Sequence, residues 1–406
     1  MELERQRSQR ALFNPLALWG EWIGSMPFRG MLQLAEASKS QQFRHCYGLF
    51  QQAIKALGPP AFDIEQVEFD GRKMPVEESV VAETEFCRLR SFSCMRDRTS
   101  KSARRVLLCA PLAGHHAMQL REVVQSLLPY ADVYVSEWVD ARDIPTTAGD
   151  FYLEDVVLTL QDFIVKLNPQ GLDVLAICQA TVPAIAAIAL LVDSNYPEPR
   201  SLVLLGGPID PRSNPTPLTG MARSLPLSWL DALGTHVVPA GYRGAGRRIY
   251  PGFLQYPSLI MAQPERQLFL LCEYMRSLGG SDTQAACDAE RSIAHNGAML
   301  DMPAEFILDT VRVVFQQTLL PRGMWRVAGR LVRPGQLCET RLLTIEGSRD
   351  TISGVGHTHA AQDLCVGVPG ERRRRITIAG CDHYGLFGGP NWRAEVYPAV
   401  HDWLVG

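Results

Sequence analysis

Three residues that could carry out acyl chemistry follow three separate apolar runs in this sequence of 406 residues. They are Cys178, Asp350 and His383. The runs LDVLAI, TRLLTIEG and RRITIAG precede them, and each is typical of a buried strand. Active groups of open parallel sheets gather at the carboxyl ends of strands, so we expect these side chains to meet. His383 would then take the thiol proton of Cys178, and Asp350 would orient the imidazole and stabilise the imidazolium.

The residues around Cys178 predict a sharp turn between a strand and a helix. Small residues stand two positions before and two after it, at Ala176 and Ala180. Larger side chains there would collide with the neighbouring strand and helix. This pattern, with the chain order nucleophile, acid, histidine, is typical of the nucleophile elbow of α/β-hydrolases. Because the flanks are Ala rather than Gly and the nucleophile is Cys rather than Ser, the alternative for this stretch alone is a buried core cysteine.

Acyl chemistry also needs hydrogen-bond donors for an oxyanion. One is usually the backbone N–H of the residue after the nucleophile, and another comes from the loop after an earlier strand. Gln179 supplies the first by its position. The loop after the run RVLLCA is the source of the second, from Leu112 or Ala113.

Four other histidines are rival site residues. His115 and His116 are adjacent, but no spaced partner such as H-x-x-x-H accompanies them, so we expect no metal. His357 and His359 follow Asp350 closely, and we expect them at the surface. We also expect no cofactor. The basic run 372–375 is interpreted as a solvated face.

Alternating strand and helix patterns must position these residues. They predict an α/β protein with a mostly parallel sheet. We expect a helical extension over 1–60, a first part of the core over 61–209, a lid or cap insertion over 210–335 and a second part of the core over 336–406. The substrate-binding residues stay open, because the aromatic stretch 250–256, Trp229 and Trp325 fit either an ester channel or the core of a lid.

The composition limits the partners of the chain. Forty Lys and Arg against 43 Asp and Glu give a formal charge of -3, so no basic field recruits nucleic acid. Ten cysteines without a C-x-x-C pair favour a reducing compartment, and we expect a cytoplasmic protein. The first ten residues lead into no apolar region typical of a signal peptide. The uncharged run 174–192 has the length of a membrane span, but its polar centre favours a strand followed by a helix.

Longer stretches of the sequence resemble the intracellular poly(3-hydroxybutyrate) depolymerases of bacteria. The resemblance covers nearly the whole chain and includes ICQATVPAIAA, LLGGPIDPRSNPT, GAGRRIYPGFLQ, LDMPAEFILDTVRVVFQQTLLPRG, GSRDTISGVGHT and DHYGLFGG. It implies an α/β-hydrolase fold, with Cys178, Asp350 and His383 as the catalytic triad. The chain differs from the family pattern at Ala180, Thr351 and Asp382.

The resemblance implies a polyester substrate, cleaved through a thioester acyl-enzyme, and a place in the cytoplasm or at the surface of storage granules. Two alternatives remain. The first is a divergent acyltransferase or thioesterase with the same triad, including polymerisation like that of the related polyhydroxyalkanoate synthases, in which a hydroxyl other than water attacks the thioester. The second is a non-catalytic granule-coating or interaction protein, which predicts the loss of a triad member. The oligomeric state is left open.

Overall fold

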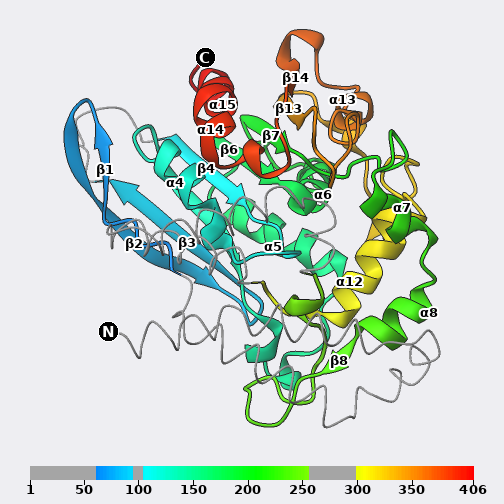
Figure 1. Ribbon diagram of the computed structural model, residues 1–406. Coiled ribbons are helices and arrows are strands. Elements are labelled where there is room, and N and C mark those ends of the chain that lie inside the picture. The colour runs from blue at the N-terminus through cyan, green and yellow to red at the C-terminus, as the bar shows by residue number, and fades with distance from the viewer. Residues whose placement is uncertain (1–60, 95–103, 256–298) are drawn as a thin grey trace, which may run out of the picture.

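A computed structural model of the chain describes residues 61–94, 104–255 and 299–406 (Figure 1). The helical extension predicted over 1–60 lies outside these described residues. The other domain boundaries stay predictions.

A nine-stranded sheet forms the centre of the described chain, in the order β1-β2-β3-β5-β4-β6-β7-β13-β14. Its strands are β1 (Gln66–Phe69), β2 (Arg72–Glu83), β3 (Cys87–Cys94), β4 (Arg104–Cys109), β5 (Ala131–Trp138), β6 (Leu172–Ile177), β7 (Ser201–Leu205), β13 (Arg341–Gly347) and β14 (Arg373–Ile378). The first three pair antiparallel at one edge, and β3 pairs antiparallel with β5. All pairs from β5 to β14 are parallel. Together with the helices below, this order is the predicted α/β-hydrolase fold.

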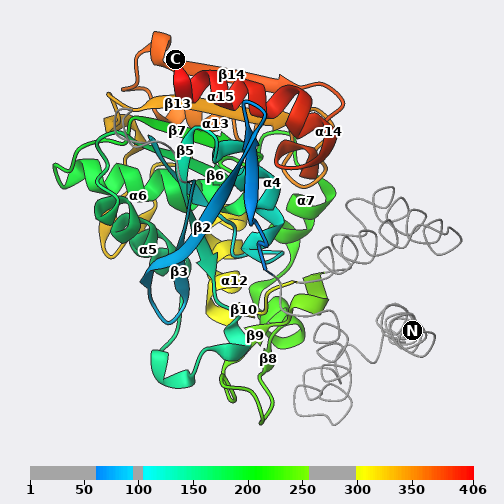
Figure 2. The same cartoon turned by 90° about the vertical axis from the view of Figure 1, so that its left-hand side faces the viewer.

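Helices lie on both faces of the sheet, as parallel strands require. The described helices are α4 (Arg121–Leu127), α5 (Leu153–Lys166), α6 (Thr181–Asp193), α7 (Pro217–Ser224), α8 (Leu227–Trp229), α12 (Ala304–Thr310), α13 (Ala360–Leu364), α14 (Gly389–Asn391) and α15 (Tyr397–Val405). Helices α5 and α6 cover one face, while α4 and α15 cover the other (Figure 2).

The central strand β6 shows how the two apolar layers arise. All six of its residues are buried. Val174 and Ala176 pack in the layer of α5 and α6, whereas Leu175 and Ile177 pack in the layer of α4 and α15. Successive side chains of a strand point to opposite faces, so a strand covered on both sides must be apolar throughout.

The uncharged run 174–192 is therefore divided between β6 and α6, as the sequence predicts. Within the described part of the chain, none of the helices combines the length and the apolar character needed to cross a bilayer.

The chain between β7 and β13 leaves the sheet and forms a separate layer of short elements. Besides α7, α8 and α12, it contains β8 (His236–Val237), β9 (Arg248–Tyr250), β10 (Met302–Pro303), β11 (Arg326–Val327) and β12 (Arg330–Leu331). The sequence pattern did not predict strands in this region. The reason is physical, since strands of two or three residues are too short to display a period of two.

Buried hydrogen bonds attach this insertion to the core. The guanidinium of Arg247 is buried and donates to the carbonyl oxygens of Ile144 at 2.9 Å, Pro145 at 2.5 Å and Gly149 at 2.8 Å. The carbonyl oxygen of Asp301 accepts a hydrogen bond from the N–H of Ala141 at 3.0 Å. The insertion is thus held against the loop that follows β5.

The end of β7 approaches the start of α6 so closely that only glycine fits at position 207. A Cβ atom on Gly207 would lie 1.8 Å from Oγ1 of Thr181. Thr181 in turn donates from Oγ1 to the carbonyl oxygen of Cys178 at 2.8 Å. Thr181, at the start of α6, therefore packs against the backbone of Gly207, which has no side chain, at the end of β7.

We predict that Gly207→Ala lowers the free energy of unfolding by about 1–3 kcal/mol, because the added methyl would overlap the side chain of Thr181, which its hydrogen bond to Cys178 holds in place. Urea unfolding followed by circular dichroism measures this change. Gly220→Ala is the control, since a Cβ at Gly220 in α7 meets nothing within 4 Å and should leave the stability unchanged or raise it by up to about 1 kcal/mol. Equal effects of the two substitutions would contradict the predicted steric overlap.

Candidate active site

Cys178 occupies a left-handed turn between β6 and α6. Its φ is +53°, whereas Ile177 before it is extended and Ala180 after it is right-handed helical. This conformation costs a residue with a side chain about 1–2 kcal/mol, so the surroundings must hold it. Ala176 and Ala180 are both buried. The predicted strand, turn, small flanks and helix are all present.

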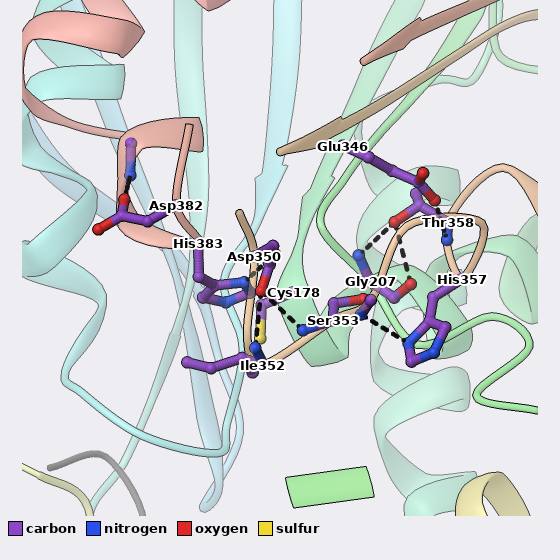
Figure 3. A network of polar contacts seen from close by, with 12 residues as sticks. Cys178, Gly207, Glu346, Asp350, Ile352, Ser353, His357, Thr358, Asp382 and His383 are labelled. Carbon is purple, nitrogen blue, oxygen red and sulfur yellow. Dashed lines mark hydrogen bonds and ion pairs between the residues drawn. The ribbon is translucent and has the colours of Figure 1, made fainter. Parts of the chain in front are cut away.

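His383 and Asp350 lie beside this turn on the loops that follow β14 and β13. Nδ1 of His383 is 2.7 Å from Oδ2 of Asp350, and both side chains are buried. The second oxygen of Asp350 accepts hydrogen bonds from the N–H groups of Ile352 at 2.8 Å and Ser353 at 2.7 Å. These bonds fix the carboxylate, which in turn orients the imidazole (Figure 3).

The thiol of Cys178 lies within hydrogen-bonding reach of His383, on the side away from the main chain of His383 (Figure 3). Burial alone would lower the pKa of His383, but the negative charges of Asp350 and of the Cys178 thiolate outweigh it. The pKa of His383 is therefore raised well above its ordinary value. Raising it favours the imidazolium, which is the counter-ion that a thiolate needs.

The two predicted sources of the second oxyanion donor differ in their surroundings. The N–H of Leu112 donates to Oε1 of the Gln179 side chain at 3.2 Å, and the Leu112 side chain is buried in the core. Ala113 lines the cavity next to Cys178, whereas Leu112 does not. The position of Ala113 therefore suits an oxyanion donor better than that of Leu112.

A largely apolar cavity of about 290 Å³ opens above Cys178. Its wall includes Cys178, Gln179 and His383 together with side chains of the insertion, such as Leu218, Ile307 and Phe315. Of the aromatic residues that the sequence left open, Tyr250 lines the cavity, Trp229 is exposed and Trp325 is buried in the core. Position 256 lies outside the described residues. Sequence patterns cannot identify such a wall, because its residues come from distant elements.

The expectation of a surface position for His357 and His359 was wrong. His357 is fully buried, and its Nδ1 accepts a hydrogen bond from the N–H of Gly354 at 3.1 Å. His359 is half-buried, and its two ring nitrogens lie 2.8 Å from Oγ1 of Thr344 and 3.1 Å from Oγ1 of Thr377. Both histidines shape the loop after β13, and neither lines the cavity.

His115 and His116 do line the cavity. Burial, with the positive charges of Arg142 and His115, lowers the pKa of His116 to about 3, so its imidazole is neutral. Among the described residues, no group of three or more His, Cys, Asp or Glu is placed to hold a metal ion. Arg372, Arg374 and Arg375 are exposed, as predicted.

Glu346 is a buried carboxylate that the sequence analysis missed. It lies on β13 and accepts hydrogen bonds from the N–H groups of Gly356 at 2.7 Å, Thr358 at 2.6 Å and His359 at 2.8 Å. The hydroxyl of Thr358 also bridges the N–H and carbonyl groups of Gly207, at 2.7 and 3.0 Å. Glu346 thereby ties the loop that starts at Asp350 to the end of β7 (Figure 3).

Comparison with protein families gives one match. Residues 206–406 match the family model described as PHB de-polymerase C-terminus. The match includes Asp350 and His383, but it begins at residue 206 and so does not include Cys178. Over these residues it confirms the resemblance found in the sequence. With the fold, it supports a carboxylic ester hydrolase.

Solved structures with a similar fold are remote in sequence. They include a lipase candidate from Acinetobacter baumannii, with a TM-score of 0.45 and 14% identity over 88% of this chain and 96% of that one. A 2-hydroxy-6-oxo-6-phenylhexa-2,4-dienoate hydrolase from Rhodococcus sp. has a TM-score of 0.44 and 10% identity over 82% of this chain and 100% of that one. Similarity at this level concerns the fold alone. No curated protein matches the sequence.

We predict that Glu346→Gln lowers the free energy of unfolding by about 1–3 kcal/mol, because an amide nitrogen would face backbone N–H donors. The same substitution at exposed Glu371 should change the stability by no more than about 0.5 kcal/mol. Chemical denaturation of both variants measures the difference. Unchanged stability of the Glu346 variant would show that its carboxylate does not hold the loop.

Proposed function

We propose that this chain, whose residues 206–406 belong to the family of the PHB de-polymerase C-terminus, hydrolyses the ester bonds of polyhydroxybutyrate or a related polyhydroxyalkanoate. Cys178 would be the nucleophile, His383 the general base and acid, and Asp350 the residue that orients His383. The observation that carries the proposal is the buried Asp350–His383 pair beside a thiol in a left-handed turn.

In the first half of the reaction, the sulfur of Cys178 attacks the ester carbonyl carbon after its proton has passed to His383. The negative charge that develops on the carbonyl oxygen is stabilised by the N–H groups of Gln179 and Ala113. The carbon–oxygen ester bond then breaks, and the leaving alcohol takes the proton from His383. The product is a thioester between the acyl group and Cys178.

In the second half of the reaction, a water molecule enters the place that the alcohol has left and attacks the thioester. His383 removes a proton from the water as its oxygen attacks the thioester carbonyl, and the carbon–sulfur bond breaks. Sulfur leaves as the thiolate, and His383 holds the proton as its counter-ion. The raised pKa of His383 suits this last state, because burial alone would disfavour the imidazolium but Asp350 and the thiolate stabilise it.

The surroundings of the thiol support an apolar substrate. Besides histidines, glutamines and a few hydroxyls, the cavity wall consists mainly of aliphatic and aromatic side chains. Such a wall accommodates the alkyl parts of an acyl chain. If the substrate is the stored polymer, the protein would act at the surface of cytoplasmic granules.

We predict that Cys178→Ala abolishes the release of 3-hydroxybutyrate and its oligomers from amorphous polyhydroxybutyrate granules. Loss of a nucleophile typically reduces kcat by a factor of about 10⁴ or more. Chromatography of the soluble products from wild type and variant measures the effect. Equal release from both proteins would remove Cys178 from the mechanism.

The same experiment separates hydrolysis from acyl transfer. Wild type that releases nothing from granules, yet forms a thioester on Cys178 with another acyl donor, would favour a divergent acyltransferase. Mass spectrometry of the peptide that carries Cys178 detects this thioester.

The raised pKa of His383 leads to a prediction about pH. Burial lowers this pKa and Asp350 is the foremost of the charges that raise it, so Asp350→Asn should lower it. The imidazolium is present only below the pKa of His383. In the variant, therefore, it would be lost at a lower pH than in the wild type. At about pH 7 we expect Cys178 of the variant to react with iodoacetamide at least about ten times more slowly than wild type.

At about pH 10 the imidazolium no longer decides how fast a thiol is alkylated, because thiols in general ionise below this pH, so the two alkylation rates should converge. Labelling is followed by mass spectrometry of the Cys178 peptide, because the exposed thiol of Cys338 would react as well. The same ratio of rates at both pH values would show that Asp350 does not act through the charge of His383.

A further inference from the structure

Three successive backbone N–H groups in the loop after β4 differ in their hydrogen-bond partners. The N–H of Leu112 donates to Oε1 of Gln179 at 3.2 Å. The N–H of Gly114 donates to Oε1 of Gln255 at 2.9 Å. Between them, the N–H of Ala113 has no partner among the described residues. Bonds on both sides fix the peptide groups that flank this N–H and leave it available to an oxyanion.

Gln255 connects this loop to the insertion. It belongs to the insertion, lines the cavity and is half-buried. Its Oε1 accepts the N–H of Gly114, and its Nε2 donates to the carbonyl oxygen of Leu300 at 2.7 Å. A backbone N–H at one end and a carbonyl at the other determine which end of the amide is which. Both ends of the side chain are therefore in use, one on the loop and one on the insertion.

The backbone of the insertion also pairs with this loop. The N–H of Leu300 donates to the carbonyl oxygen of Gly114 at 3.0 Å. Next to it, His115 forms an antiparallel β-bridge with Met299. The φ of Gly114 is +102°, a conformation that residues with a side chain rarely adopt. The insertion therefore holds both backbone polar groups of Gly114, at a point where the chain would otherwise have the freedom of glycine.

Gln255 is itself held close to the segment to which it donates. The N–H of Gly252 donates to the carboxylate of Asp301 at 2.7 Å. A Cβ atom on Gly252 would lie 2.5 Å from the carbonyl oxygen of Met299, so only glycine allows this approach. The segment that carries Gln255 thus packs directly on the backbone of Met299, and the amide has a fixed support.

We propose that Gln255 is a positioning residue for the oxyanion donor at Ala113. This inference rests on the proposed function and adds that the insertion, besides lining the cavity, completes the catalytic arrangement. An oxyanion donor is effective because it is in place before the charge develops. A misplacement of about 1 Å can cost about 10²-fold in rate. Gln255 prevents such a displacement by fixing the peptide group next to the donor.

The test uses two reactions of Cys178 that differ in whether an oxyanion forms. Cleavage of 4-nitrophenyl butyrate passes through an oxyanion, whereas in alkylation by iodoacetamide the sulfur displaces iodide and no oxyanion forms. Gln255→Met keeps the length of the side chain and removes both hydrogen-bonding ends. We expect kcat/KM for the ester to fall by about 10- to 100-fold. The rate of alkylation at about pH 7 should stay within about twofold of wild type, because the thiol and His383 are unchanged.

Gln316→Met is the matched control, since Gln316 is another half-buried glutamine of the insertion. Its Nε2 donates to the carbonyl oxygens of Ala222 at 3.3 Å and Leu225 at 2.8 Å, both within the insertion. It does not line the cavity. This substitution also removes hydrogen bonds, but it should leave both rates within about twofold of wild type.

Gln255→Asn is a second variant that stays polar at this position. It keeps an amide but is shorter by a methylene, so it cannot bridge Gly114 and Leu300. We expect the same fall in ester cleavage. Thermal unfolding of all variants checks that they are folded.

Unchanged ester cleavage in both Gln255 variants would overturn this inference and leave the proposed function intact. Equal falls in ester cleavage and alkylation would do the same, because Gln255 would then support the site as a whole rather than its oxyanion donor. Wild type that cleaves neither this ester nor polyhydroxybutyrate, or cleavage that survives Cys178→Ala, would instead overturn the proposed function and this inference with it.

Discussion

The left-handed backbone at Cys178 is the constraint on which the rest of the site depends. It turns the chain from a fully buried strand into a helix within one residue and presents the thiol at the edge of the sheet. Because this conformation is unfavourable for any residue with a side chain, its neighbours must hold it. Thr181 holds the carbonyl of Cys178, and bare backbone at Gly207 leaves room for Thr181.

The same glycine connects the elbow to the acid. Thr358 bridges the two backbone polar groups of Gly207, and Glu346 holds the backbone N–H of Thr358. The loop that Glu346 fixes begins at Asp350, which orients His383. Cys178, Asp350 and His383, the candidate nucleophile, acid and base, are thus joined through hydrogen bonds at the ends of β7 and β13. Such a rigid arrangement keeps reacting groups aligned without reorganisation during the reaction.

Sequence reasoning located the strands, the elbow and the three candidate catalytic residues, because each depends on local signals. A strand covered on both faces must be apolar throughout, and a turn at its end can be recognised by the small residues Ala176 and Ala180. The wall of the cavity could not be predicted in this way. Leu218, Ile307 and Phe315 of this wall differ from other apolar residues only in what surrounds them after folding. Likewise, no local pattern in the sequence distinguishes buried His357 or Glu346 from exposed histidines and glutamates.

The order of the strands also has a consequence for how the chain folds. Strand β7 pairs with β13, although the whole insertion separates them in sequence. Closing so long a loop is entropically costly and slow, so this pairing is expected late. The turn that carries the thiol lies on strands formed earlier, whereas Asp350 and His383 lie beyond the late pairing. During synthesis on the ribosome, Cys178 would therefore lack its neighbours Asp350 and His383 until the last strands are in place, and the candidate site would be complete only when the sheet is.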